Sequence, residues 1–263
     1  MMAIEIFTGD SNTFEQQQEA VRRSLTSASG ERSPHLPMHA ERWLIVGAGG
    51  FGREIYYWTQ GQLQSTGQDF PIGFLDDNRD SLKAYPSLAP YWVDRISDYV
   101  PRQGDRLLMA IADPTIKLQL GKQLTERGAT FATYIHPKAV ITADAKFGAG
   151  CIVCPMTVVC CNVQVGDFVS LNLGTVVGHD SIISDGCTLS PHANISGQSV
   201  LERGVFVGCQ AVILPKVHVG EFARIGAGSS VIGHVRSHST MLGVPAKRVS
   251  WTKHPDASET KAA

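Results

Sequence analysis

A histidine and an aspartate stand side by side in the second half of the chain, in the sequence Val177-Gly178-His179-Asp180. An imidazole, with an ordinary pKa of about 6.5, can take a proton from an attacking amine or hydroxyl group at neutral pH. His179 is therefore a candidate general base for a group-transfer reaction. The alternative is an ordinary solvent-facing histidine.

A second candidate site is the glycine-rich loop Gly47-Ala48-Gly49-Gly50-Phe51-Gly52, which follows an apolar run and precedes a predicted helix. Glycines let a backbone approach a phosphate, and a helix N-terminus offers unpaired N–H groups. We therefore expect Gly47, Gly49, Gly50 and Gly52 to bind a phosphate.

Strands are predicted at residues 42–46, 71–75 and 107–111, with a helix from Asp113 to about Arg127. Asp76 and Asp77 follow the second strand and are predicted to accept hydrogen bonds from ribose hydroxyls or a base edge. The segment from Arg42 to Tyr134 has room for one mononucleotide half of a dinucleotide fold. This favours a nucleotide or nucleotide-sugar site over a purely structural domain or an NAD site.

The second half must position His179, and it has a repeat of six residues. Every sixth residue from Ile135 to Val231 is apolar, and a second series, four positions later and running from Ala139 to Val235, contains only small or β-branched residues. A period of six fits neither a helix nor an ordinary strand. It fits short strands joined by corners, three to a triangular coil, so residues 135–236 predict a parallel β-helix.

Glycines often follow the bulky residue of a repeat, where we expect either a positive φ or close backbone packing. These are Gly148, Gly166, Gly178, Gly208, Gly220 and Gly226. His179 falls at a predicted corner, and Gly197 falls one coil later, about 4.8 Å away. A residue without a side chain at that place is predicted to leave room for a substrate beside His179.

The six cysteines include Cys151-Ile152-Val153-Cys154, which resembles a metal or redox motif. Because Cys151 and Cys187 belong to the small inward series, we interpret the cysteines as small buried apolar residues and expect no metal site. His136, His218, His234 and His238 have no comparable acidic neighbour and are predicted to be surface or cap residues.

Composition excludes several classes of function. Lys and Arg (23) balance Asp and Glu (24), so a broad basic face for nucleic acid is not expected. No apolar run is long enough for membrane insertion. Free thiols fit a reducing compartment, and we expect a cytoplasmic protein.

The loop Ile45-Val46-Gly47-Ala48-Gly49-Gly50-Phe51-Gly52-Arg53-Glu54, the strand end Phe74-Leu75-Asp76-Asp77 and the hexapeptide repeat together resemble one family. It is the bacterial sugar acyltransferases, which include sialic acid O-acetyltransferases and N-acetyltransferases of nucleotide-linked 4-amino sugars. The resemblance covers roughly residues 42–250 and implies a left-handed β-helix. It also implies acetyl-CoA as co-substrate, a nucleotide-linked sugar acceptor and a homotrimer with active sites between subunits.

The resemblance also implies roles for single residues. Asp180 would orient His179, Asn172 would lie near the acceptor sugar, and Gly197 would contact the acetyl group. Met241-Leu242-Gly243-Val244-Pro245-Ala246-Lys247-Arg248 is similar to the ending of the superfamily's β-helix. Gly226 and Gly228 would line the pantetheine path, and Lys247 or Arg248 would meet CoA phosphates. The chain departs from the family at Thr188, where relatives often have a second histidine, and His192 follows four residues later. Thr188 can still hydrogen-bond and is expected to contact acetyl-CoA.

The sequence therefore predicts an α/β plus all-β protein with four segments. These are a poorly ordered extension (1–40), a half-Rossmann nucleotide-sugar-binding domain (41–134), a left-handed β-helix (135–236) and a C-terminal cap and tail (237–263). The expected activity is acetyl-CoA-dependent N-acetylation of a nucleotide-linked amino sugar. The alternatives are O-acetylation of sialic acid or another sugar hydroxyl, and a noncatalytic nucleotide-sugar-binding scaffold. A serine acetyltransferase is a further alternative, although the glycine loop speaks against the helical domain that usually precedes that enzyme's β-helix.

Overall fold

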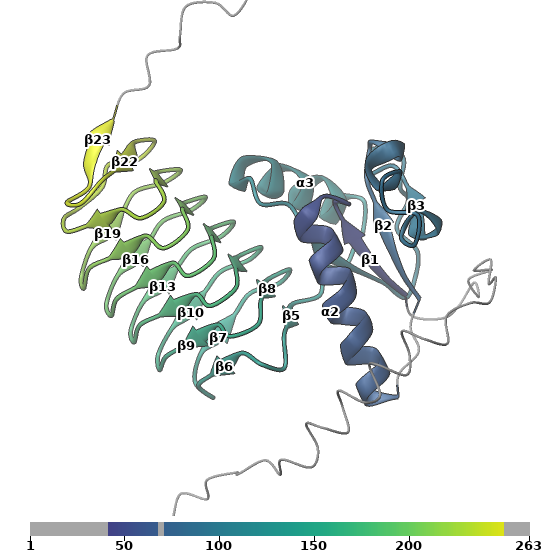
Figure 1. The fold of residues 1–263 in the computed structure, drawn as a ribbon, viewed down its shortest axis with the longest axis horizontal. Helices are drawn as coiled ribbons and strands as arrows, with labels where there is room; N and C mark the ends of the chain where they lie inside the picture. The colour runs from purple at the N-terminus through teal and green to yellow at the C-terminus, as the bar shows by residue number, and fades with distance from the viewer. Residues whose placement is uncertain (1–41, 68–70, 250–263) are drawn as a thin grey trace, which may run out of the picture.

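The computed structural model describes residues 42–67 and 71–249 and has two parts, a small α/β domain and a β-helix (Figure 1). The predicted extension at residues 1–40 and the end of the predicted C-terminal tail lie outside the described residues. No helix in the described ranges has both the length and the apolar character needed to cross a bilayer.

The α/β domain has a parallel sheet in the order β3-β2-β1-β4. Its elements are β1 (Arg42–Val46), α2 (Gly50–Thr66), β2 (Ile72–Leu75), η1 (Arg79–Leu82), η2 (Ala89–Tyr91), β3 (Trp92–Asp94), β4 (Asp105–Met109) and α3 (Pro114–Glu126). Alternate residues of β1 enter different cores: Ile45 packs with Ile55 of α2, whereas Leu44 packs with Leu124 of α3. The helices therefore cover opposite faces, and the strand order reverses beside β1, where α/β sheets bind ligands.

The second part is a left-handed parallel β-helix of two-residue strands, followed by a terminal hairpin. The strands are β5 (Tyr134–Ile135), β6 (Val140–Ile141), β7 (Lys146–Phe147), β8 (Ile152–Val153), β9 (Val158–Val159), β10 (Gln164–Val165), β11 (Ser170–Leu171), β12 (Val176–Val177), β13 (Ile182–Ile183), β14 (Thr188–Leu189), β15 (Asn194–Ile195), β16 (Val200–Leu201), β17 (Phe206–Val207), β18 (Val212–Ile213), β19 (His218–Val219), β20 (Arg224–Ile225), β21 (Ser230–Val231), β22 (Thr240–Leu242) and β23 (Lys247–Val249).

The strands form three sheets, one per side of the triangle. We call them the β11 sheet, the β12 sheet and the β13 sheet, after one member of each. Ser170 of β11 pairs with Thr188 of β14, one coil later. The bulky series points inward, as Val177 and Leu189 are fully buried, and the small series does too, as at Ala193. The predicted repeat and its coil length are confirmed.

The left-handed residue of each corner lies two positions after the place of the predicted glycine. Left-handed φ values recur every sixth residue, at positions such as Asn162 (57°), Asp180 (58°), Gly186 (68°) and His192 (60°). The glycines directly after the bulky residues instead allow close packing between coils. A Cβ atom on Gly178, for example, would lie 2.6 Å from the backbone nitrogen of Gly197.

The hairpin of β22 and β23 closes the C-terminal end of the β-helix. Strand β22 pairs in parallel with β20 of the β11 sheet, and β23 then pairs antiparallel with β22. The hairpin therefore covers an edge that the last coil would otherwise expose.

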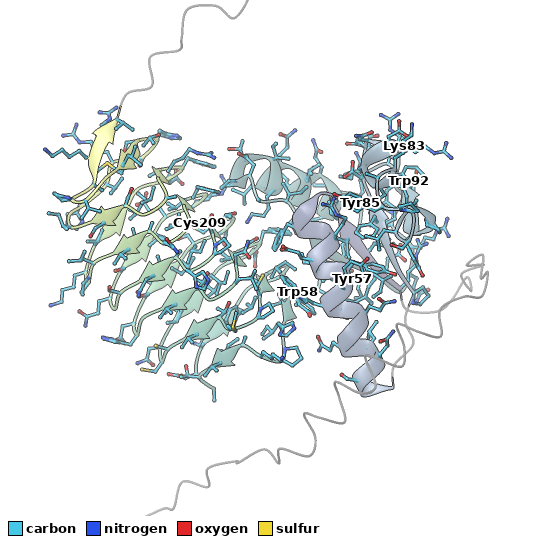
Figure 2. The ribbon with its side chains drawn as sticks, viewed as in Figure 1. Tyr57, Trp58, Lys83, Tyr85, Trp92 and Cys209 are labelled. Carbon is cyan, nitrogen blue, oxygen red and sulfur yellow. The ribbon has the colours of Figure 1, made fainter. Side chains whose placement is uncertain are left out.

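The α/β domain packs against the β11 sheet. Ile152 and Cys154 belong to the same buried cluster as Tyr56 of α2. Trp58 lies on the side of α2 that faces the β-helix, with its ring 6.0 Å from that of His136 (Figure 2). The other helix, α3, approaches the β-helix closely at Gly186, where a Cβ atom would meet Leu118 of α3 at 2.5 Å.

Candidate active site

His179 lies at the exposed corner between β12 and β13. Its Nδ1 atom is 2.7 Å from Oδ2 of Asp180, and the other carboxylate oxygen of Asp180 accepts a hydrogen bond from Nδ2 of Asn162 at 3.1 Å. These two hydrogen bonds, the one from His179 first, lower the pKa of Asp180 and keep it ionised. With Nδ1–H donating to Asp180, the neutral imidazole has its lone pair on Nε2. Nε2 is the atom that can accept a proton.

Gly197 lies next to His179 in the following coil, as the repeat predicts. A Cβ atom on Gly197 would lie 2.6 Å from Nε2 and 2.8 Å from Cε1 of His179. The space left by the missing side chain is therefore filled by the imidazole, not left open for a substrate. Gly197 sets the position of the ring, and its N–H takes part in none of the backbone hydrogen bonds given for the described residues.

The glycine loop is held by Asp76. Oδ2 of Asp76 accepts a hydrogen bond from the N–H of Ala48 at 2.7 Å, and Oδ1 accepts one from the N–H of Asn78 at 2.9 Å. Gly52 must be a glycine, because a Cβ atom there would lie 2.0 Å from the carbonyl oxygen of Gly47. Asp76 thus shapes the loop, and ribose binding by Asp76 and Asp77 stays a prediction.

The loop leaves the N-terminus of α2 open to an anion. Gly49 is the N-cap residue and supplies no side-chain hydrogen bond, while Gly49 and Gly50 are exposed. The first N–H groups of a helix have no partner within the helix. Arg53 adds a positive charge nearby, with its guanidinium 3.8 Å from the ring centroid of Tyr85. The arrangement can bind a phosphate.

Three other predicted residues lie at a different corner from His179. Asn172, Gly226 and Gly228 occupy the corner between the β11 sheet and the β12 sheet. Oδ1 of Asn172 accepts a hydrogen bond from the N–H of Leu173 at 2.8 Å, and a Cβ atom on Gly226 would meet Leu242 at 2.4 Å. One chain therefore does not bring these residues to His179.

Thr188 is buried between the two domains and away from the His179 corner. Its hydroxyl accepts a hydrogen bond from Nζ of Lys117 at 2.7 Å and donates to the carbonyl oxygen of Ala112 at 2.8 Å. These contacts join the two domains, and a contact of Thr188 with acetyl-CoA stays a prediction. The exposed His192 instead lies against Gly174, where a Cβ atom would be 2.5 Å from its Nδ1 atom.

Lys247 and Arg248 lie on β23 at the C-terminal end of the β-helix, and both are exposed. They are separated from His179 by about four and a half coils, or about 21 Å along the axis. Their contact with CoA phosphates stays a prediction.

Sequence reasoning missed a second histidine–carboxylate pair. Nε2 of His218 lies 2.7 Å from Oε1 of Glu202, which belongs to the preceding coil. The prediction that His218 lacks an acidic neighbour is therefore wrong, because stacking brings together residues that are distant in sequence. The repeat could have revealed this pair. His218 stacks on Val200 of the preceding coil, and Glu202 follows Val200 by two positions.

The interpretation of the cysteines holds only in part. Cys151, Cys154 and Cys187 are buried, and burial raises the pKa of the Cys151 thiol to about 11. Cys161 and Cys209 are exposed, so these two are not buried apolar residues. Within the part of the chain that the structure describes, no three His, Cys, Asp or Glu side chains form a group suited to a metal ion.

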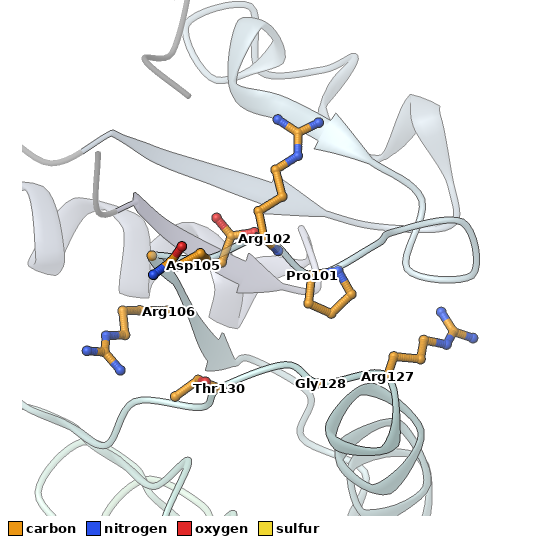
Figure 3. Close-up of a pocket in the computed structure, with 9 residues that line it drawn as sticks. Pro101, Arg102, Asp105, Arg106, Arg127, Gly128 and Thr130 are labelled. Carbon is orange, nitrogen blue, oxygen red and sulfur yellow. Dashed lines mark hydrogen bonds between the residues drawn. The ribbon is translucent and has the colours of Figure 1, made fainter. Parts of the chain in front are cut away.

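A hollow of about 290 Å³ lies elsewhere, between the Pro101–Arg106 segment and residues Arg127 to Thr130 (Figure 3). It adjoins Asp105 at the amino end of β4, whereas the glycine loop follows the carboxyl end of β1. The side chains of Arg102, Arg106 and Arg127 point in different directions in Figure 3. The hollow is thus separate from both candidate sites.

Comparison with known sequences gives serine acetyltransferases, and no family model matches the chain. The Buchnera aphidicola protein is 30% identical over 172 residues, which cover 64% of this chain and 52% of that protein. The Escherichia coli K12 protein is 28% identical over 176 residues, which cover 64% of this chain and 51% of that protein. The chain thus spans about half the length of these curated relatives.

Solved structures match a larger share of the chain. WeeI from Acinetobacter baumannii AYE is 26% identical, with a TM-score of 0.72, covering 80% of this chain and 100% of that chain. The acetyltransferase domain of PglB from Neisseria gonorrhoeae, in complex with acetyl coenzyme A, is 24% identical, with a TM-score of 0.71 and the same coverage. PerB from Caulobacter crescentus, in complex with CoA and GDP-perosamine, is 24% identical, with a TM-score of 0.69, covering 82% of this chain and 100% of that chain. The chain therefore has the two-part fold of the hexapeptide-repeat acyltransferases, the family that its sequence resembles.

Proposed function

We propose that this protein transfers the acetyl group of acetyl-CoA to the amino group of a nucleotide-linked sugar, with His179 as general base. The observation that carries the proposal is the exposed His179 ring, held by Asp180 on one side and by Gly197 on the other. The solved acetyltransferases that share both domains support it, since two of them hold acetyl-CoA or CoA.

His179 acts through Nε2 in this proposal. As the amine nitrogen forms a bond to the thioester carbonyl carbon, Nε2 accepts the proton that the amine loses. The resulting imidazolium is stabilised by the carboxylate of Asp180, 2.7 Å from Nδ1. When the C–S bond breaks, the same proton passes from Nε2 to the leaving sulfur. No covalent intermediate with the protein is needed.

Acetyl-CoA would supply an activated thioester carbonyl at this corner. The residues fit such a group, because the corner is exposed and the N–H of Gly197 donates to no backbone acceptor among the described residues. That N–H is the proposed donor to the oxygen that becomes negative in the transition state. Lys247 and Arg248 are the proposed ligands of the CoA phosphates.

The acceptor's nucleotide would bind at the glycine loop and the N-terminus of α2. In one chain, however, the α/β domain covers the β11 sheet, and His179 lies at the corner between the other two sheets. Asn172, Gly226 and Gly228 are likewise at another corner. We therefore propose a homotrimer in which neighbouring chains complete each site. A monomer in sedimentation velocity at micromolar concentration would contradict this assembly.

Serine is the second candidate acceptor, because the curated relatives are serine acetyltransferases. The glycine loop with its open helix N-terminus favours the nucleotide-linked acceptor, since serine carries no phosphate for it to bind.

The test is a thiol-release assay with acetyl-CoA and a panel of acceptors: UDP- and GDP-linked 4-amino sugars, free sialic acid, and serine. We expect release only with a nucleotide-linked amino sugar. Release with serine alone or sialic acid alone would overturn the acceptor assignment, and no release with any acceptor would favour the noncatalytic scaffold.

A further inference from the structure

Lys117 is a fully buried lysine at the interface between the two domains. It lies on α3, and its Nζ atom donates three hydrogen bonds to the β11 sheet and its corner. The acceptors are Oγ of Ser170 at 3.0 Å, Oγ1 of Thr188 at 2.7 Å and the carbonyl oxygen of Cys187 at 3.1 Å. Three acceptors match the three N–H groups of an ammonium. The side chain is thus fixed in position and in direction.

This burial is not explained by an ion pair. Among the ion pairs of the described residues none includes Lys117. The carboxylate of Asp113, the N-cap residue of α3, lies 3.6 Å from Arg224. Removing an ammonium from water carries a large free-energy cost that a buried methionine of similar length would not carry. Burying Lys117 therefore does not by itself stabilise the fold, and what the side chain contributes is its directed hydrogen bonds.

Hydrogen bonds and packing contacts connect Lys117 with the glycine loop. Thr188, which accepts from Lys117, donates to the carbonyl oxygen of Ala112 in the loop between β4 and α3. That loop lies against Gly47, since a Cβ atom on Gly47 would meet Ile111 at 2.8 Å and the carbonyl oxygen of Ala110 at 3.3 Å. A continuous set of contacts thus joins the β-helix to the candidate phosphate site.

We propose that Lys117 is a positioning residue that fixes the α/β domain, and with it the glycine loop, on the β-helix. In a transferase of the proposed kind the acceptor bound at the loop must reach a thioester held along the β-helix. The catalytic part of the inference rests on the proposed function, whereas the docking part does not.

Hydrogen exchange on the full-length protein tests the docking part. Lys117→Met keeps the length of the side chain and removes its hydrogen bonds. We expect exchange in residues 112–121 and at Thr188 to rise by about tenfold or more, because local opening becomes easier there. Lys122→Met is the matched control, since Lys122 lies on the same helix with a side chain 77% exposed. Unchanged exchange in Lys117→Met would overturn the proposal.

Kinetics tests the catalytic part. We expect kcat/KM for the acceptor to fall by about 100-fold in Lys117→Met, the usual effect of misplacing a reactant by about 1 Å, with KM for acetyl-CoA within about twofold of wild type. Equal losses for both substrates would indicate a general loss of structure and contradict a positioning role. Failure of wild type to transfer acetyl would instead contradict the proposed function and leave the exchange result intact.

Thr188→Val provides a second route if Lys117→Met folds poorly. It removes the same link from the β-helix side with little change of shape. We expect a smaller effect of the same kind, and a loss in the double variant smaller than the sum of the two single losses, because the Lys117–Thr188 hydrogen bond is common to both. Additive losses in the double variant would overturn the shared link.

Discussion

Gly197→Ala offers a sharp test of the His179 site. The new Cβ atom would lie 2.6 Å from Nε2 of His179, where carbon atoms normally approach only to about 3.5–4.0 Å. The imidazole must therefore move by about 1 Å, which breaks its 2.7 Å contact with Asp180. A shift of that size at a catalytic group costs on the order of 100-fold in rate, or about 2.7 kcal/mol of transition-state stabilisation.

The same substitution should leave folding nearly intact. The His179 side chain is 57% exposed, so the loss of its contact with Asp180 should lower Tm by only about 2–4 °C. The control is Gly233→Ala, two coils further on the same corner, where no atom lies within 4 Å of the new Cβ. Thiol release at saturating acetyl-CoA and thermal unfolding measure the two effects. Wild-type turnover in Gly197→Ala, or a loss that follows unfolding alone, would refute this account of the corner.

Three further outcomes follow from packing and charge. Gly52→Ala places a Cβ atom 2.0 Å from the carbonyl oxygen of Gly47, so nucleotide binding measured by calorimetry should be lost; Gly61→Ala, with open space around its Cβ, should bind normally. Leu189→Ala should lower the free energy of unfolding in urea by about 2–5 kcal/mol, because Leu189 is fully buried; a loss below about 1 kcal/mol would contradict its place in the core. Burial lowers the pKa of Lys117 from 10.5 to about 7, so between these pH values the unfolded chain binds a proton that the folded chain does not. Stability should therefore rise with pH over this range, less so in Lys117→Met, and identical pH profiles would contradict the lowered pKa of the buried Lys117 amine.

Much of the fold could be predicted because a repeat that is visible in the local sequence determines which distant residues stack on one another. An apolar residue at every sixth position fixes which side chains enter the interior and, through the coil length, which residues stack. That is how Gly197 could be placed beside His179 from the sequence. The strand Arg42–Val46 and the helix capped by Asp113 also follow from local signals, and the Asp113 carboxylate accepts hydrogen bonds from the N–H groups of Thr115 and Ile116.

The contacts between the two domains could not be predicted in the same way. Lys117 stands at an ordinary position of an amphipathic helix, and nothing local distinguishes it from Lys122. Its burial depends on where α3 meets the β11 sheet, which is tertiary information. The contacts of Thr188 with the α/β domain could not be predicted for the same reason. The pairing of His218 with Glu202 required attention to stacked neighbours, not only to sequence neighbours.

The most direct test of the proposed mechanism is the initial rate of acetyl-CoA-dependent thiol release, with a nucleotide-linked 4-amino sugar, for wild type and His179→Asn. Asparagine keeps a polar side chain at the exposed corner but cannot accept the amine's proton at neutral pH. General-base catalysis contributes about 10²–10⁴-fold, so kcat should fall by that factor with little change in Tm. Turnover in His179→Asn within a few-fold of wild type would contradict His179 as the base.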